Sequence, residues 1–322
     1  MLKIFENNTQ SKVVWSGLDA WQTQTPTSHA EPEPEPEPAP SPVHPLDAIG
    51  SPASKTLNSL AFCGAPGGVG KTSLAINVAF ELASASKKVA LIDLDIDHPN
   101  LMTALCQQSL TAGLSGAHRL ISQGRFNADD LDRLTMVLNF DGVRLWVLPG
   151  LAKPAEPEAR VDFASSIVTL LEAFSESFDW VVFDLPSSIQ ADQFVQQCLG
   201  LADFAFAVCG GEPTQIQRYL WSQPNLKTGL ANAPQVIVNG VRDAVIGSDS
   251  KRQIADTLEQ AAQAEVVAFV PHDQAGFDAA LLEGLPLQLV KKGSGARHAL
   301  SMFVRQGLLG QRASLDWRLL RG

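Results

Sequence analysis

Nine residues, from Ala65 to Ser73, constrain the fold of this 322-residue chain more than any other feature. They read Ala-Pro-Gly-Gly-Val-Gly-Lys-Thr-Ser, follow the short apolar run Leu60–Cys63 and open an apolar helical pattern at Lys71. A glycine-rich turn between a strand and a helix directs backbone N–H groups inward at a helix N-terminus, where negative charge is stabilised. The sequence therefore predicts a phosphate-binding loop, with Lys71 reaching the outer phosphates and the Thr72 hydroxyl available to Mg²⁺.

Short apolar or β-branched runs alternate with longer amphipathic runs between residues 59 and 307. This alternation is typical of a parallel sheet covered by helices. We therefore predict an α/β fold with a doubly wound, mostly parallel sheet in one domain of about 250 residues. The predicted strands are Leu60–Cys63, Val89–Leu94, Val143–Leu148, Trp180–Phe183, Phe204–Val208, Gln235–Val238 and Val266–Val270. Helices are predicted to begin at Lys71, Val161, Ala191, Pro213, Ser250, Gly276 and Ser294.

Aspartates follow two of the predicted strands. Asp93, Asp95 and Asp97 come at the end of the second strand, and Asp184 ends a later one. Sheets of this class bind ligands at the carboxyl ends of their strands. A buried carboxylate at such an end needs compensation, which Mg²⁺ held through water supplies. Asp97 lies one step past the pattern and is explained equally well as a helix cap or turn residue.

The N-terminal part of the chain has a different composition. No lysine or arginine occurs between Lys12 and Lys55, and Glu-Pro repeats from Glu31 to Pro38. Because proline fixes φ and the glutamates repel one another, we predict a disordered Pro/Glu-rich linker at residues 23–57. Residues 1–22 are an apolar island that either binds a partner or is a poorly ordered terminus.

Membrane spanning and metal-binding modules are not predicted. No apolar run approaches the roughly 18 residues that cross a bilayer, and the first ten residues lack the apolar core of a signal peptide, so we expect a cytoplasmic protein. The four cysteines have no CxxC spacing and the six histidines have no ligand spacing with them. Neither a disulfide framework nor a zinc site is therefore expected.

Positive charge is concentrated at the C-terminus. Residues 291–322 contain seven basic side chains and one acid, for a charge of +6, although the whole chain carries −10. The remaining residues together carry −16, which argues against a nucleic-acid partner outside the tail. Residues 308–322 mix leucines and a tryptophan with arginines. That tail is compatible either with contact to an anionic membrane surface or with a plain helix that packs on the domain.

Several motifs together resemble the MinD/ParA class of P-loop ATPases. They are Gly67–Thr72, the Asp-x-Asp at 93–95, Asp184-Leu185-Pro186, Asn239 after a strand, and Val270–Asp273. The resemblance runs from about Leu60 to Met302 and covers nearly the whole globular part. It implies that the chain binds ATP and Mg²⁺, hydrolyses ATP slowly and forms an ATP-dependent homodimer.

The same resemblance implies roles for individual residues. Lys71 and Asp95 would be catalytic, with Asp95 orienting the attacking water. Thr72, Asp93 and Asp184 would hold the Mg²⁺ shell. The residues that bind ATP would be Gly67, Gly68, Val69, Gly70, Lys71, Thr72, Ser73, Asn239, Pro271 and Asp273, the last three around the adenine.

One residue departs from the family pattern. Pro66 occupies the position of the second, signature lysine, which in the family reaches across an ATP-sandwiched dimer. Because the amides that face phosphate lie further along the loop, we expect nucleotide binding to survive. Hydrolysis is expected to be weak, or to use another side chain such as Arg242. The alternative is that Pro66 merely stiffens the loop and dimer closure relies on other contacts.

Members of this class position cellular structures, and the sequence separates their roles poorly. The Asp184–Pro186 ending, the long N-terminal extension and the altered loop most resemble the CpaE/TadZ pilus-assembly branch and its septum-site relatives, with MinD as the neighbouring interpretation. We expect protein partners from such a positioning or assembly system, at the inner face of the cell membrane if the tail binds lipid. The alternatives are a nucleotide-binding scaffold with little hydrolysis and a ParA-like partitioning ATPase. Because Tyr219 is the only tyrosine, a kinase that modifies a tyrosine cluster is excluded.

Overall fold

A computed structural model describes residues 57–64, 67–155, 159–187, 192–227, 233–247 and 249–310, and the side chains at 159–162, 225 and 227 are not described. The predicted island at residues 1–22, the linker up to residue 56, Pro66 and the tail beyond residue 310 lie outside the described residues. The predictions made for these segments therefore stay predictions.

Eight strands form one sheet in the order β3-β4-β2-β5-β1-β6-β7-β8. The strands are β1 (Asn58–Cys63), β2 (Val89–Asp93), β3 (Met136–Phe140), β4 (Val143–Leu148), β5 (Trp180–Asp184), β6 (Phe204–Gly210), β7 (Gln235–Val241) and β8 (Val266–Pro271). All neighbouring pairs are parallel except the β3–β4 hairpin. The predicted doubly wound, mostly parallel sheet is therefore confirmed.

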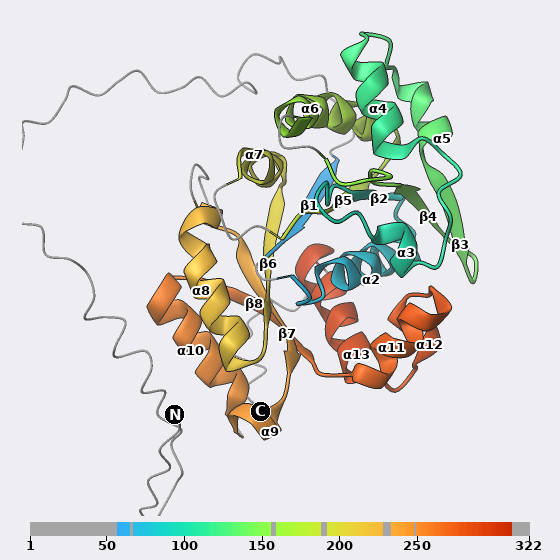
Figure 1. Cartoon of the computed structure of the whole chain (residues 1–322). Helices are drawn as coiled ribbons and strands as arrows, with labels where there is room; N and C mark the ends of the chain where they lie inside the picture. Colours follow the sequence, from blue (N-terminus) through green and yellow to red (C-terminus); the bar gives the residue numbers. More distant parts are fainter. Residues whose placement is uncertain are drawn as a thin grey trace, which may run out of the picture. The chain divides into compact units, whose positions relative to one another are not determined.

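Helices cover both faces of the sheet (Figure 1). Helices α2, α11, α12 and α13 lie on one side, and α6, α7, α8 and α10 lie on the other. The longer helices are α2 (Lys71–Ser84), α4 (Gly113–Ser122), α6 (Ala159–Ser177), α7 (Gln193–Leu201), α8 (Pro213–Lys227), α10 (Ser250–Ala262), α11 (Gln274–Glu283) and α13 (Gly295–Met302). Short elements are α3 (Leu101–Ala104), η2 (Ala128–Asp130), α5 (Leu131–Leu134), α9 (Asp243–Ile246), α12 (Leu287–Val290) and the π-helix η3 (Phe303–Leu308).

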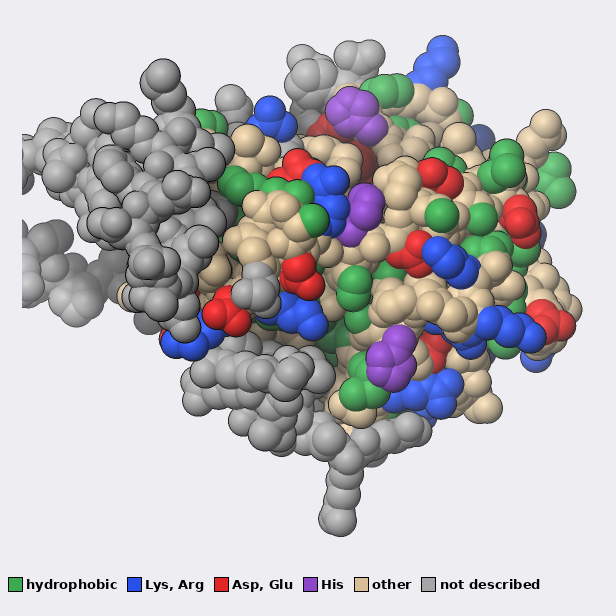
Figure 2. Space-filling model, turned by 90° about the horizontal axis from the view of Figure 1, so that it is seen from below, with side chains coloured by type: hydrophobic (Ala, Val, Ile, Leu, Met, Phe, Trp, Pro, Cys, Tyr) green, Lys and Arg blue, Asp and Glu red, His purple; other side chains and the backbone are tan. Residues whose placement is uncertain are grey.

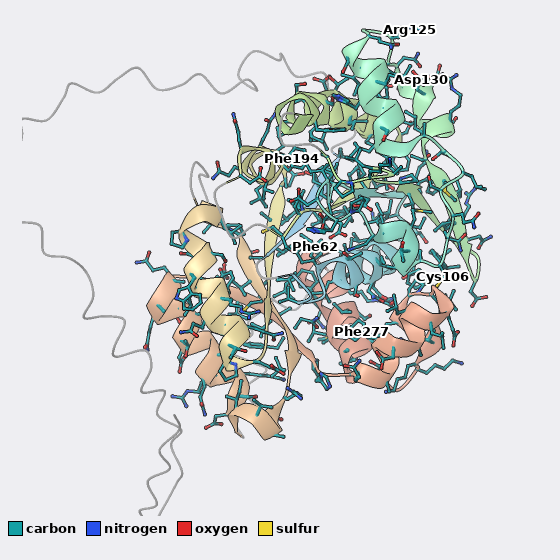
Figure 3. All side chains as sticks on the ribbon, in the orientation of Figure 1. Phe62, Cys106, Arg125, Asp130, Phe194 and Phe277 are labelled. Carbon is teal, nitrogen blue, oxygen red and sulfur yellow. The ribbon has the colours of Figure 1, made fainter. Side chains whose placement is uncertain are left out.

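The central strands read as continuous apolar runs because both of their faces are covered. All residues of β2 and β5 are buried, as are all but the first of β1. This is the composition expected of parallel strands between two helical layers. Phe62 lies in the middle of this arrangement (Figure 3), and its ring contacts Phe206, which in turn contacts Phe303 in η3.

The sequence analysis missed the edge strand β3 and the short helices, although it predicted β4, the partner of β3, with its observed bounds. Strand β3 pairs antiparallel with β4, and its residues alternate in exposure, so it lacks the buried run by which the other strands were recognised. Helix α4 was also missed. Predicted helix starts differ from the observed ones by up to two residues, in some cases because a capping side chain decides the first turn. For example, α7 begins at Gln193 because Asp192 accepts hydrogen bonds from the N–H groups of Phe194 and Val195.

Candidate functional site

The phosphate-binding loop joins the end of β1 to the start of α2, as predicted. Gly68 and Gly70 have φ values of 80° and 93°, which glycine adopts without steric cost. Gly70 also has no room for a side chain, since a Cβ atom there would lie 2.4 Å from Asn239 Nδ2. Helix α2 begins directly after Gly70, so the free N–H groups of its first turn face the loop.

The Lys71 side chain is held inside the site. Its exposed fraction is 7%, and Nζ donates a hydrogen bond to Ser187 Oγ at 2.7 Å. Ser187 follows Asp184 by three residues, in the segment after β5. The sequence analysis did not identify Ser187, because a serine after Pro186 carries no signal of its own. In this structure, the lysine that is predicted to reach phosphate is therefore engaged by a neutral hydroxyl.

Two of the predicted aspartates lie opposite each other at the carboxyl ends of neighbouring strands. Asp93 ends β2, Asp184 ends β5, and the two are register partners. Burial raises the pKa of Asp93 to about 7, with the nearby Asp184 carboxylate adding to the shift. Burial also raises the pKa of Asp184 to about 6, and the Lys71 charge and the Thr72 hydroxyl oppose that shift.

The two carboxylates differ in their hydrogen bonds. Asp93 Oδ1 accepts from the N–H of Asp95 and Oδ2 from the N–H of Leu101, each at 3.1 Å. Neither oxygen of Asp184 makes a hydrogen bond of normal geometry within the described residues, although both are buried. Asp93 thus organises the loop after β2, whereas the Asp184 carboxylate is left free for a ligand.

This arrangement fits a magnesium ion held mainly by the substrate and by water. The unpaired oxygens of Asp184 and the hydroxyl of Thr72 are hard oxygen ligands of the kind that Mg²⁺ prefers. Among the described residues, no cluster of three His, Cys, Asp or Glu side chains could hold a metal ion by itself.

Asp95 lies in the loop after β2, close enough to raise the pKa of both Asp93 and Asp184. Its side chain is 4% exposed, and Oδ1 accepts from the N–H of His98 at 2.9 Å. Its own N–H is held by Asp93. The structure therefore brings Asp93, Asp95 and Asp184 close together, and Asp93 holds the backbone at Asp95.

A cavity of about 300 Å³ adjoins the loop and contains the predicted adenine-binding residues. Its lining comprises Gly68, Val69 and Gly70 from the loop, Ser73 in the first turn of α2, Asn239 and Gly240 near the end of β7, Pro271 at the end of β8, and His272 and Asp273 directly after it, together with Gly210, Glu212, Gln215, Gln274 and Phe277. The size lies at the lower end of the range for small-molecule sites. Figure 3 shows Phe277 on α11, the helix that borders this cavity.

Asn239 connects the cavity to the phosphate-binding loop. Its Nδ2 donates to the carbonyl of Val69 at 2.9 Å, and its buried Oδ1 has no hydrogen-bond partner within the described residues. Asp273 also lines the cavity, but it caps α11 and pairs with Lys291 at 2.6 Å, which holds its pKa below the usual range. Only Oδ1 of Asp273 is engaged in these contacts, so each of the two predicted residues keeps one buried oxygen without a hydrogen-bond partner among the described residues.

The sequence analysis did not predict the ion pair that lies beside this cavity. Glu212, which lines the cavity, pairs with Arg242 across the segments that follow β6 and β7. Arg242 was named in the sequence analysis as one side chain that hydrolysis could use if it is not simply weak, and in this structure it is engaged by Glu212. No local signal reveals this pairing, because the partners lie 30 residues apart.

A comparison with known families matches the CobQ/CobB/MinD/ParA nucleotide binding domain over residues 60–287. A virulence plasmid ParA family protein of Chlamydia muridarum is 31% identical over 137 residues, which are 42% of this chain and 49% of that protein. An iron-sulfur cluster carrier protein of Synechocystis sp. is 31% identical over 132 residues, or 40% of this chain and 34% of that protein. The chain thus matches half or less of the length of these relatives.

Solved structures share the fold. The MinD cell division protein of Aquifex aeolicus has a TM-score of 0.60 and 23% identity, with 80% of this chain and 99% of that chain covered. A complex of Cyanothece McdA with ATP has a TM-score of 0.62 and 18% identity, with 81% of this chain and 98% of that chain covered. At these identities the likeness concerns the architecture alone.

Proposed function

Because the chain belongs to the CobQ/CobB/MinD/ParA nucleotide-binding family, we propose that it binds ATP with Mg²⁺ and acts as a nucleotide-dependent switch that hydrolyses ATP slowly. One observation carries the proposal. The unpaired, buried Asp184 carboxylate lies near Thr72 and Lys71, where a metal ion and phosphates would supply the missing partners. The adjoining cavity offers the free Asn239 Oδ1 to a base.

Binding of ATP and Mg²⁺ would give several polar groups of the site new interaction partners. The amides from Gly68 to Ser73 would surround phosphate at the positive end of α2. Lys71 would exchange the Ser187 hydroxyl for phosphate oxygens, which carry full charge and form stronger hydrogen bonds. Thr72 and Asp184 would hold Mg²⁺, which on binding neutralises phosphate charge.

Hydrolysis in this site would rest on positioning and charge stabilisation. Asp95 would orient the attacking water, and Asp93 would support it by holding its backbone N–H. Pro66 stands where the family has its signature lysine, so we propose that hydrolysis is weak. For Arg242 to take the place of that lysine, it would have to leave Glu212. A scaffold with little hydrolysis is the second candidate, favoured by Pro66.

We propose that the switch positions a cellular structure through ATP-dependent dimerisation and protein partners, at a septum site or in pilus assembly. MinD in complex with MinC is among the structures of the same fold. Among the described residues, no helix has both the length and the apolar character needed to cross a bilayer. Contact with an anionic membrane surface is proposed separately, for the tail at residues 308–322.

A ParA-like partitioning role is a further candidate, suggested by the plasmid relative. A DNA partner needs a basic face, but the chain outside its last 32 residues carries −16. On the face in Figure 2, Lys and Arg side chains are mixed with Asp and Glu, without a continuous basic field. We therefore rank this role below the first.

The switch is tested by the mass of the full chain in solution, measured by light scattering with Mg²⁺ and ADP and then with a non-hydrolysable ATP analogue. A dimer that forms only with the analogue is expected, and Lys71→Ala should abolish it. Lys251→Ala, on α10, is the matched control and should leave it intact. An unchanged mass, together with ATP turnover no faster than in Lys71→Ala, would favour the scaffold. Turnover that persists in Lys71→Ala would exclude the proposed site.

A further inference from the structure

A basic pocket lies at the opposite edge of the sheet from the phosphate-binding loop. It has a volume of about 690 Å³, opens to solvent, and is lined where α2 ends and where β2 and β4 begin. Its lining residues are Ala83, Ser84, Ser86, Lys87, Lys88, Gly142, Val143, Arg144 and Trp146. Because α2 has 14 residues, about 20 Å separates this pocket from the loop at the other end of the helix.

Three cations gather in this pocket, two of them over one aromatic ring. The Lys88 ammonium lies 5.2 Å from the centre of the Trp146 ring and 4.5 Å from that of Phe178. The Arg144 guanidinium lies 5.4 Å from the centre of the same Trp146 ring. Lys87 is the third cation and is exposed. Contacts of a cation with a ring hold the charged group in place without neutralising it.

Among the described residues, no carboxylate forms an ion pair with this cluster. The Asp179 carboxylate accepts the backbone N–H of Lys88. The turn residue Asp141 does not line the pocket. The negative end of the α2 dipole stabilises the lysines only in part. In a chain of net charge −10, a group of three cations without an ion pair among the described residues is an unusual local surplus.

We propose that this pocket binds an acidic, extended peptide segment of a partner protein. Charge complementarity favours carboxylates, and the Trp146 ring adds an apolar surface on which a proline or an aliphatic side chain can pack. Ser84 and Ser86 also line the pocket; the Ser84 hydroxyl donates to the carbonyl of Glu81 and can still accept a hydrogen bond. Three cations in a hollow match a few carboxylates, whereas duplex DNA or a flat membrane needs a broader basic face.

The proposal is independent of ATP hydrolysis. It is tested with the full chain and a fluorescein-labelled peptide of four Glu-Pro repeats, followed by fluorescence anisotropy at low salt and in 0.5 M NaCl. We expect binding that salt weakens and that the double variant Lys87→Gln/Arg144→Gln weakens about tenfold or more. Lys88 is left in place because its half-buried side chain packs on Phe178.

The matched control is Lys251→Gln/Arg252→Gln, which removes the same charge from α10 on the other side of the sheet. It should bind the peptide as the unaltered chain does. Both double variants should keep the affinity for ATP, which verifies that the fold is intact. Equal losses in the two variants, or no loss in either, would overturn the proposal.

Two further probes and one further variant test whether something other than an acidic partner peptide occupies the pocket. An oligothymidylate of equal charge and phosphatidylserine vesicles should bind more weakly than the peptide, and tighter binding of either through Lys87 and Arg144 would reassign the pocket. The full chain with Glu31, Glu33, Glu35 and Glu37 changed to glutamine should bind the peptide no differently. If only this variant binds it, the chain's own repeat competes for the pocket and the assignment to a partner is wrong.

Discussion

We expect the substitution Asp184→Asn to stabilise the protein and at the same time to remove its proposed Mg²⁺-dependent binding of ATP. Asp184 is 0% exposed and lacks hydrogen bonds of normal geometry within the described residues, and burial raises its pKa from 3.8 to about 6. A raised pKa means that the ionised form is less stable in the folded state than in the unfolded chain. Asp184→Asn removes that charge with little change of shape.

The magnitude follows from the pKa. A shift of roughly two units corresponds to about 3 kcal/mol, which is the upper limit of the gain. The asparagine amide remains unpaired, so a net gain of about 1–2 kcal/mol is expected at pH 7.5. The unaltered protein loses this stability as the pH rises from about 4 through about 6, because the folded state then has to bury the charge. Asp184→Asn should therefore have a higher free energy of unfolding than the unaltered protein above pH 6, and no higher value at pH 4.

Urea unfolding without nucleotide, at pH 4.5 and at pH 7.5, measures this difference. Asp203→Asn is the control of opposite sign, because Asp203 Oδ2 accepts hydrogen bonds from the Ser59 N–H at 2.7 Å and the Ser59 hydroxyl at 2.8 Å. Weakening these hydrogen bonds should lower the free energy of unfolding by about 1 kcal/mol. If Asp184→Asn is as stable as the unaltered chain at pH 7.5, or less stable, the assignment of Asp184 as an uncompensated charge is wrong. Titration calorimetry should also show that this variant no longer binds ATP in a Mg²⁺-dependent manner.

Three further predictions concern the loop, the C-terminal elements and the thiols. Gly70→Ala places a Cβ atom 2.4 Å from Asn239 Nδ2 at a φ of 93°, so ATP binding should be lost in calorimetry. Glu81→Ala leaves Arg305 without its partner at 2.9 Å and should lower the free energy of unfolding by about 2 kcal/mol, measured in urea, with ATP affinity unchanged. Of the four cysteines only Cys106 is exposed, so a thiol reagent should modify one thiol in the native protein and four in denaturant.

Much of the fold could be predicted from patterns within short stretches of the sequence. The phosphate-binding loop, the buried strands and most of the long helices were predicted because glycine turns and apolar periodicity are properties of short stretches of chain. The edge strand β3 and helix α4 were missed. In β3 the apolar run is only three residues long, Met136–Leu138, and in α4 glycines and polar residues interrupt the apolar pattern. The family was also predictable, because its motifs lie at fixed places relative to these strands.

The site was only partly predictable. The sequence placed Asp93, Asp95 and Asp184 at strand ends, but it did not distinguish their hydrogen bonds. In the structure, backbone N–H groups occupy both oxygens of Asp93, whereas Asp184 has none. Which carboxylate is free depends on how the loop after β2 folds back, and in the structure the N–H of Leu94 in that loop donates to the carbonyl of Asp184 at the end of β5.

The sequence by itself determined which chemical groups this protein carries: a phosphate-binding loop, acids at strand ends and an asparagine near the end of β7. Only the tertiary structure decided which of these groups meet. Asn239 donates to Val69 across 170 residues, and Lys71 donates to Ser187 across 116. The physical reason is that a local pattern is set by neighbouring residues. A contact between distant residues depends instead on the order and register of the strands, which only the packing of the whole sheet establishes.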